Sequence, residues 1–373
     1  MSCTAPVNER TFVMIDEALP EWITYPEDEW TEITAEEAGL DVKIWHGLLA
    51  RMDVGRFQNS DVEVSGSESW GTVFTRGGYL VHSWGNGDFR AQTASMGKAF
   101  TWAVLGLAVE RGLVNPNEFI WETWIGEGQL SHPHKYMNQG HHRSLTWDLL
   151  GRKKGNVHWG GFPVTNGYYW KKQSTAQNIP EGSVPEWANW TGDPYFDNYS
   201  HTEPGVNGIY SSGAQWRLSQ ALTVAWDQDI KTVLDDELFG KIGIHRDSWH
   251  WTPGLELFQQ KDWYPHMPGY GDFLDPPYEI NGHLVRGGPG WVVMSAKDLA
   301  RFGHLLVTGG LWKGKRLLGQ QWLIGHGGGN GSGVAGEGRN YTAFGIVTTR
   351  GIDFNNPFFP DRVFTGPVVA MIK

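Results

Sequence analysis

Cysteine is almost absent from this sequence, because Cys3 is the single cysteine among 373 residues. One cysteine cannot form a bond within the chain, so an internal disulfide framework is excluded. Basic residues are also scarce relative to acidic ones, with 30 Lys and Arg against 41 Asp and Glu and a formal net charge of −11. This balance argues against a nucleic-acid-binding surface and against a polybasic membrane anchor.

Long apolar runs are missing as well. No stretch approaches the roughly 20 apolar residues that a membrane-spanning helix needs, and residues 1–12 lack the apolar segment of a signal peptide. We therefore expect no membrane span and a cytoplasmic location by default, with a removed signal peptide as the alternative. The hydrophobic fraction of 40% and the charged fraction of 19% are typical of a globular protein of one or two domains.

Tryptophan, in contrast, is abundant, with 21 residues. These rings can pack in a core or form the walls of a substrate cleft, and we favour packing. Two histidine pairs, His132 with His134 and His141 with His142, raise the question of a metal site. Neither a His-Glu-x-x-His motif nor a cysteine pair accompanies them, so we interpret them as loop histidines and expect no metal and no cofactor.

The stretch with the most chemical content is Ser95-Met96-Gly97-Lys98. Apolar residues at three- and four-residue spacing predict a helix over residues 96–109, and Gly112 is a plausible stop. With Ser95 at the start of that helix, Lys98 lies one turn further on the same face. Unpaired N–H groups and the positive end of the helix dipole then surround the serine oxygen. A serine becomes a good nucleophile when a neighbour takes its proton, although this spacing also occurs by chance.

Local patterns predict several further elements. A hairpin is expected where two β-rich runs flank Gly77-Gly78, and Ser295 is expected to cap a helix that ends before Gly309-Gly310. The expected elements are a hairpin at 71–85, a short helix at 145–151 capped by Ser144 or Thr146, helices at 214–227, 230–239 and 296–307, a small-residue turn and short strand at 287–294, and a strand at 341–349. Residues 152–208 and 255–284 read as loop regions, the first as a binding region.

Three motifs in chain order carry a family resemblance. They are Ser95-Met96-Gly97-Lys98, Tyr210-Ser211-Ser212 and His326-Gly327-Gly328. Because these three motifs occur in this order, the sequence resembles the serine β-lactamase and penicillin-binding-protein superfamily over residues 65–350. It is most similar to the class C branch, which includes D-amino-acid peptidases, family VIII carboxylesterases and nylon-oligomer hydrolases.

The resemblance implies an α/β (α+β) fold with an antiparallel sheet flanked by helices. Residues 1–119 and 286–373 would form this sheet domain, and residues 120–285 would form a helical, loop-rich domain. The active site would lie between the two, with Ser95 at the seam.

The same resemblance implies a role for each motif residue. Ser95 would attack an ester or amide carbonyl of a small-molecule substrate and form an acyl-enzyme. Lys98 and Tyr210 would share the proton transfer, and the sequence leaves open which of them is the base. The backbone N–H groups of Ser95 and Gly329 would hold the oxyanion.

Departures from the family pattern bear on the substrate. Ser212 stands where the family has an asparagine that binds a side-chain amide, and His326 stands where it has a lysine that binds a carboxylate. Because histidine is mostly neutral near pH 7, a carboxylesterase or simple amidase is favoured over a β-lactamase or D-amino-acid peptidase. A non-catalytic relative is a third possibility.

Phe364-Thr365-Gly366 is a rival third motif, but Pro367 after it has no N–H for an oxyanion.

Overall fold

The structure is a computed structural model of the 373-residue chain. It describes residues 19, 21–53, 71–93, 97–124, 140–151, 153–154, 157–158, 160, 203–206, 211–259, 277–319, 341–342 and 345–346.

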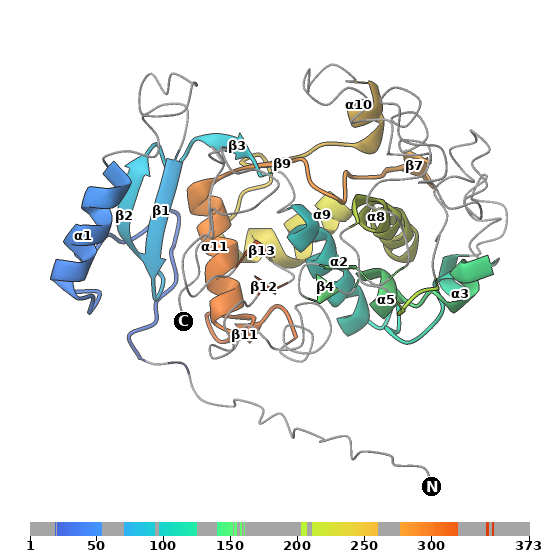
Figure 1. The fold of residues 1–373 in the computed structure, drawn as a ribbon, viewed down its shortest axis with the longest axis horizontal. Coiled ribbons are helices and arrows are strands. Elements are labelled where there is room, and N and C mark those ends of the chain that lie inside the picture. The colour runs from blue at the N-terminus through green and yellow to red at the C-terminus, as the bar shows by residue number, and fades with distance from the viewer. Residues whose placement is uncertain are drawn as a thin grey trace, which may run out of the picture.

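The predicted hairpin is confirmed as β1 (Gly71–Arg76) and β2 (Tyr79–Gly85), which pair antiparallel. Gly77 and Gly78 turn the chain with φ of 61° and 91°, a left-handed backbone conformation that residues with a side chain rarely adopt. Helices α1 (Val42–Asp53) and α11 (Ala296–Val307) lie on opposite sides of the hairpin (Figure 1). A hairpin alone is marginally stable, and these helices supply the packing that it needs.

The bounds of helix α11 are set by local sequence signals at its two ends. Its bounds are the predicted ones, and the Ser295 Oγ accepts a hydrogen bond from the Asp298 N–H at 3.1 Å. Gly309 and Gly310 follow the helix with φ of 66° and 83°. The predicted N-terminal cap and glycine stop are therefore both confirmed.

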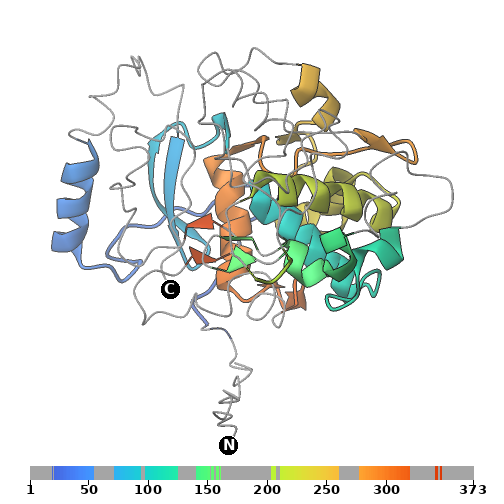
Figure 2. The same ribbon diagram turned by 45° about the vertical axis from the view of Figure 1, so that its right-hand side comes forward.

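The centre of the molecule is made of helices α2 (Lys98–Glu110) and α8 (Ser212–Trp226). Residues 98–108 of α2 are buried on every side, as expected for a helix that is apolar all round. The two helices pack against each other and lie side by side in Figure 2. One hydrophobic cluster joins them to β9 (Val292–Ser295) and to α11.

The remaining elements are short. The helical ones are α3 (Ile120–Trp124), η2 (Gly140–Ser144), α5 (Trp147–Gly151), α9 (Ile230–Leu234), η3 (Asp235–Phe239), η4 (Gly240–Ile242) and α10 (Gly254–Gln259). The strands are β3 (Arg90–Gln92), β4 (Lys153–Lys154), β5 (Val157–His158), β6 (His250–Trp251), β7 (Glu279–Ile280), β8 (His283–Leu284), β10 (Leu311–Trp312), β11 (Lys315–Arg316), β12 (Tyr341–Thr342) and β13 (Gly345–Ile346).

All pairs of named strands in the described part are antiparallel, one isolated bridge between Glu32 and Leu80 is parallel, and the described sheet with the most strands has the order β3-β9-β6. The expected class, helices combined with antiparallel sheet, is thereby confirmed. The division into a sheet domain and a helical domain stays a prediction.

Three of the predicted elements differ in detail. The helix expected at 230–239 is α9 followed by the π-helical turn η3, in which i to i+5 bonds replace i to i+4 bonds. The loop expected at 255–284 contains most of α10 and the hairpin β7–β8. Of the strand expected at 341–349, the structure describes β12 and β13, which pair antiparallel with Tyr341 opposite Ile346, and the other residues of this range lie outside the described part. At 230–239 the pattern predicted a helix but missed its change of winding, and at 255–284 the prediction of a loop was wrong for the residues of α10 and of β7–β8.

The tryptophans of the described part mostly serve packing, as we expected. Ten of them are buried, namely Trp30, Trp45, Trp84, Trp102, Trp147, Trp216, Trp249, Trp251, Trp291 and Trp312. Among the described helices, none is both long and apolar enough to cross a membrane. The described residues also contain no group of three or more His, Cys, Asp or Glu side chains that could hold a metal ion.

Candidate active site

Lys98 is the first residue of α2, and its side chain is only 1% exposed. Its Nζ donates a hydrogen bond to the carbonyl oxygen of Pro289 at 2.7 Å. Lysine is rarely buried to this degree unless its ammonium group has a partner. The structure thus places the lysine of the first motif inside the molecule, at the start of the most buried helix.

The start of α2 touches the turn at residues 287–290 directly. A Cβ added to Gly97 would lie 2.7 Å from Cα of Gly290 and 2.8 Å from its carbonyl atoms. A Cβ added to Gly288 would lie 2.4 Å from the backbone oxygen of Gln215 in α8. Such distances leave no room for a side chain, so glycine permits this turn to fit between the two helices.

Side chains hold the turn through its carbonyl groups. Each carbonyl oxygen from 286 to 290 accepts a hydrogen bond from a side chain. The pairs are Ser219 Oγ to Arg286 at 2.7 Å, Trp251 Nε1 to Gly287 at 3.0 Å and to Gly290 at 3.1 Å, Thr101 Oγ1 to Gly288 at 2.8 Å, and Lys98 Nζ to Pro289 at 2.7 Å. Since buried carbonyl groups need partners, donors from α2, α8 and β6 together fix the position of this turn.

Arg286 anchors the entry to the turn. Its Nε donates to both carboxylate oxygens of Asp229, at 2.9 and 3.1 Å, its Nη2 forms an ion pair with the same carboxylate, and its Nη1 donates to the Trp251 carbonyl at 2.6 Å. At the exit, Trp291 has a φ of 57°, which is unusual for a bulky residue. Backbone strain of this kind tends to collect at functional sites.

The described residues of the second motif, Ser211 and Ser212, lie at the start of α8. Ser211 is fully buried and caps the helix, because its Oγ accepts a hydrogen bond from the Ala214 N–H at 2.9 Å. Ser212 is the first helical residue and is half-buried. Since α2 and α8 pack together, Lys98 and these two serines lie at the starts of neighbouring helices.

Several predicted site residues lie outside the described residues. They are Ser95, Tyr210, the third-motif residues His326, Gly327 and Gly328, and Gly329, together with the rival motif Phe364-Thr365-Gly366. Their assigned roles therefore stay predictions. Lys98 and Ser212 are the predicted site residues that the structure describes.

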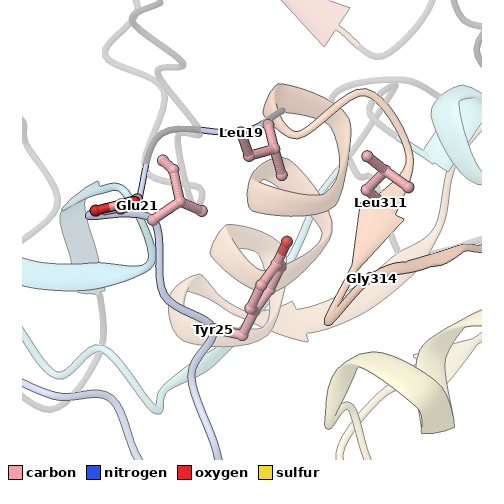
Figure 3. A pocket seen from close by; sticks show the side chains of 6 residues that line it. Leu19, Glu21, Tyr25, Leu311 and Gly314 are labelled. Carbon is pink, nitrogen blue, oxygen red and sulfur yellow. The ribbon is translucent and has the colours of Figure 1, made fainter. Parts of the chain in front are cut away.

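One cavity, of about 340 Å³, lies elsewhere, between the N-terminal segment and the hairpin β10–β11. It is lined by Leu19, Glu21, Ile23, Tyr25, Leu311 and Gly314. In Figure 3 the Tyr25 ring points between the side chains of Leu19 and Leu311. Burial raises the pKa of Tyr25, although the backbone N–H of Lys313 opposes this rise. None of the lining residues belongs to the three motifs.

Sequence reasoning missed the residues that hold the turn, above all Thr101, Ser219 and Arg286. One signal was present in the sequence, because Thr101 lies three residues after Lys98 and shares its helix face. The density of glycine at 287–290 was a second signal. The pairing of these two stretches could not be read, because 187 residues separate Thr101 from Gly288.

Comparison with known proteins gives a likeness in fold alone. No protein-family model matches this sequence, and no curated protein matches it. Similar solved structures include a protein from Bacillus anthracis that is provisionally named a 6-aminohexanoate-dimer hydrolase. It is 15% identical to this chain, with a TM-score of 0.44 over 74% of this chain and 65% of that chain.

Two further solved structures show a similar level of likeness. A β-lactamase/D-alanine carboxypeptidase from Pseudomonas syringae is 18% identical, with a TM-score of 0.41 over 67% of this chain and 62% of that chain. A family VIII carboxylesterase is 14% identical, with a TM-score of 0.39 over 63% of this chain and 60% of that chain.

By their names, these neighbours are a dimer hydrolase, a β-lactamase/D-alanine carboxypeptidase and a carboxylesterase. The chain spans less than two thirds of the length of each of the three. With every TM-score below 0.5, the likeness carries no argument about the site or the activity. Any function must therefore be argued from the residues of this chain.

Proposed function

We propose that this chain is a serine hydrolase that cleaves an ester or a simple amide through an acyl-enzyme on Ser95. The observation that carries the proposal is the buried Lys98, three residues after Ser95, with its Nζ held 2.7 Å from the Pro289 carbonyl. Nucleophilic catalysis by serine needs a neighbouring group that takes the serine proton, and a buried amine three residues from Ser95 in the sequence is a candidate for that group.

The proposed reaction assigns each residue one task. The Ser95 oxygen attacks the substrate carbonyl while its proton passes to the pair formed by Lys98 and Tyr210. The N–H groups of Ser95 and Gly329 stabilise the negative oxygen of the tetrahedral intermediate. The leaving group departs with a proton from the same pair, and water then hydrolyses the acyl-enzyme and regenerates Ser95.

The proposed substrate is a compact ester or amide without an essential carboxylate. Ser212 has a short hydroxyl where the family's asparagine offers an amide, and His326 supplies little positive charge near neutral pH. Gly327 and Gly328 would line the same side of the site. A substrate that depends on a salt bridge to its carboxylate, as a β-lactam does, would bind weakly.

The test compares a short nitrophenyl ester with the β-lactam nitrocefin. We expect kcat/KM to be higher for the acetyl or butyryl ester, because discrimination follows the contacts that each substrate gains in the transition state. The Ser95→Ala variant should lose ester turnover while its melting temperature stays close to that of the unaltered protein. Higher kcat/KM for nitrocefin would refute the substrate class, and full activity of Ser95→Ala would refute the nucleophile.

A further inference from the structure

Thr101 lies one turn after Lys98 on the same face of α2, and its side chain is fully buried. Helical threonines commonly donate their hydroxyl to a carbonyl of their own helix. Thr223 in α8 does so, with its Oγ1 2.9 Å from the Ser219 oxygen. Thr101 donates out of its helix instead, to the carbonyl of Gly288 at 2.8 Å. Its hydroxyl therefore links α2 to the turn at residues 287–290.

The Gly288 carbonyl is adjacent in the chain to the one that receives Lys98. The Gly288–Pro289 peptide unit is planar and the proline ring locks φ at residue 289, so once the Gly288 oxygen is fixed only ψ of Pro289 sets where the Pro289 oxygen points. Lys98 begins α2, and there the helix dipole disfavours a positive charge. The negative end of the Pro289 carbonyl dipole offsets this effect, so its placement influences how Lys98 is held.

We propose that Thr101 is a positioning residue for Lys98, acting through the turn, and that Ser219 assists from α8 by holding the Arg286 carbonyl. The inference rests on the proposed hydrolase function, in which Lys98 must stay aligned with Ser95. Thr101 itself would not touch the substrate. Removing its hydroxyl would leave the Gly288 carbonyl without this donor, loosen the turn and let the Lys98 amine move from its working position.

The first test measures the burial of Lys98 directly, without using Ser95. Acetylation of lysines by N-hydroxysuccinimidyl acetate, followed by peptide mass spectrometry, reports how accessible each amine is. We expect slow acetylation of Lys98 in the unaltered protein compared with Lys313, whose side chain is 46% exposed. Thr101→Val should raise the Lys98 rate several-fold, Thr101→Ser should restore it, and the control Thr223→Val should leave it unchanged.

The second test measures ester turnover in the same variants. Thr101→Val should lower kcat by about tenfold to a hundredfold with little change in KM, as small misplacements of a catalytic group do. Thr101→Ser should recover most of the rate, and Thr223→Val should keep it. Unchanged Lys98 acetylation in Thr101→Val, or an equal kcat loss in Thr223→Val, would overturn the proposal. Absence of turnover in the unaltered protein would count against the hydrolase function, while the acetylation rates would still decide the role of Thr101.

Discussion

At the scale of single residues, Lys98 combines a cationic side chain with almost complete burial. Its Nζ donates a hydrogen bond to a backbone carbonyl, that of Pro289. A carbonyl holds an ammonium group in place without neutralising its charge, whereas a carboxylate would commit the lysine to an ion pair. In the proposed reaction, Lys98 exchanges a proton with Ser95 or Tyr210.

Tyr210→Phe separates proton transfer from packing. The substitution keeps the ring and its volume, so the melting temperature should change little. Loss of a positioned proton-transfer group typically costs about 10²- to 10⁴-fold in rate. We expect a loss of this size for Tyr210→Phe and for Lys98→Met, with the double variant little worse than either, because groups that act together are non-additive. A loss under about tenfold in kcat for Tyr210→Phe would make Tyr210 a packing residue and leave Lys98 as the first candidate for the base.

His304 gives the molecule a pH dependence away from the candidate site. It is buried between Tyr25 and Trp312, and its Nε2 lies 2.7 Å from the Thr24 oxygen. Burial lowers the pKa of His304, although the bond to Thr24 opposes the shift. The unfolded chain therefore binds more protons than the folded one just below about pH 6.5, and the free energy of unfolding must fall as the pH falls through that range.

The His304→Gln variant tests this sign, because glutamine cannot be protonated and can still donate to Thr24. We expect the stability advantage of the unaltered protein over the variant to shrink between about pH 7.5 and about pH 5.5 in urea unfolding. Burial raises the pKa of Asp298 and Glu110, which adds a slope of opposite sign at lower pH in both proteins. A constant difference across the range would contradict the assignment to His304.

At the scale of elements, the turn at residues 287–290 is the join between α2 and α8. Gly288→Ala would place a Cβ 2.4 Å from the Gln215 oxygen and 2.7 Å from the Ser219 Cβ. Both neighbours are inflexible, so the turn must shift. We expect a loss of about 1 to 3 kcal/mol in the free energy of unfolding, together with a fall in kcat.

Gly47→Ala in α1 is the matched control for that prediction. A Cβ at Gly47 would meet nothing within 4 Å, and its φ is not in the left-handed region. Alanine in a helix interior is favoured over glycine by up to about 1 kcal/mol, so this variant should be as stable or more stable, with normal turnover. Equal stability of Gly288→Ala and Gly47→Ala in urea unfolding would show that the contact between the turn and α8 is unimportant.

At the scale of the whole molecule, local signals predicted elements well and long-range contacts poorly. The hairpin β1–β2 and helix α11 follow from glycine turns and a serine cap, whose physics acts within a few residues. The turn around Pro289 depends on donors such as Lys98, 191 residues away in the chain. Hydrophobic periodicity carries no information on which distant segments meet, so the motif residues could be predicted while the structure that holds them could not.

The second motif shows the same limit of local signals. The residues Tyr210-Ser211-Ser212 were recognised by resemblance, yet the capping role of Ser211 emerged only from the structure. Serine is a strong N-cap residue, but two adjacent serines made the choice ambiguous in the sequence. Ser212, which we predicted to contact substrate, begins α8 and stays a proposed binding residue.

The most direct measurement is covalent labelling of Ser95. Incubation with a fluorophosphonate probe, followed by mass spectrometry of the intact protein and of its peptides, shows whether one residue is phosphonylated and which residue it is. We predict a single adduct on the peptide that carries Ser95, and none in Ser95→Ala, because the probe reacts with an activated serine. An adduct on another residue, or an unlabelled protein that still hydrolyses esters, would contradict the assignment of Ser95 as the nucleophile.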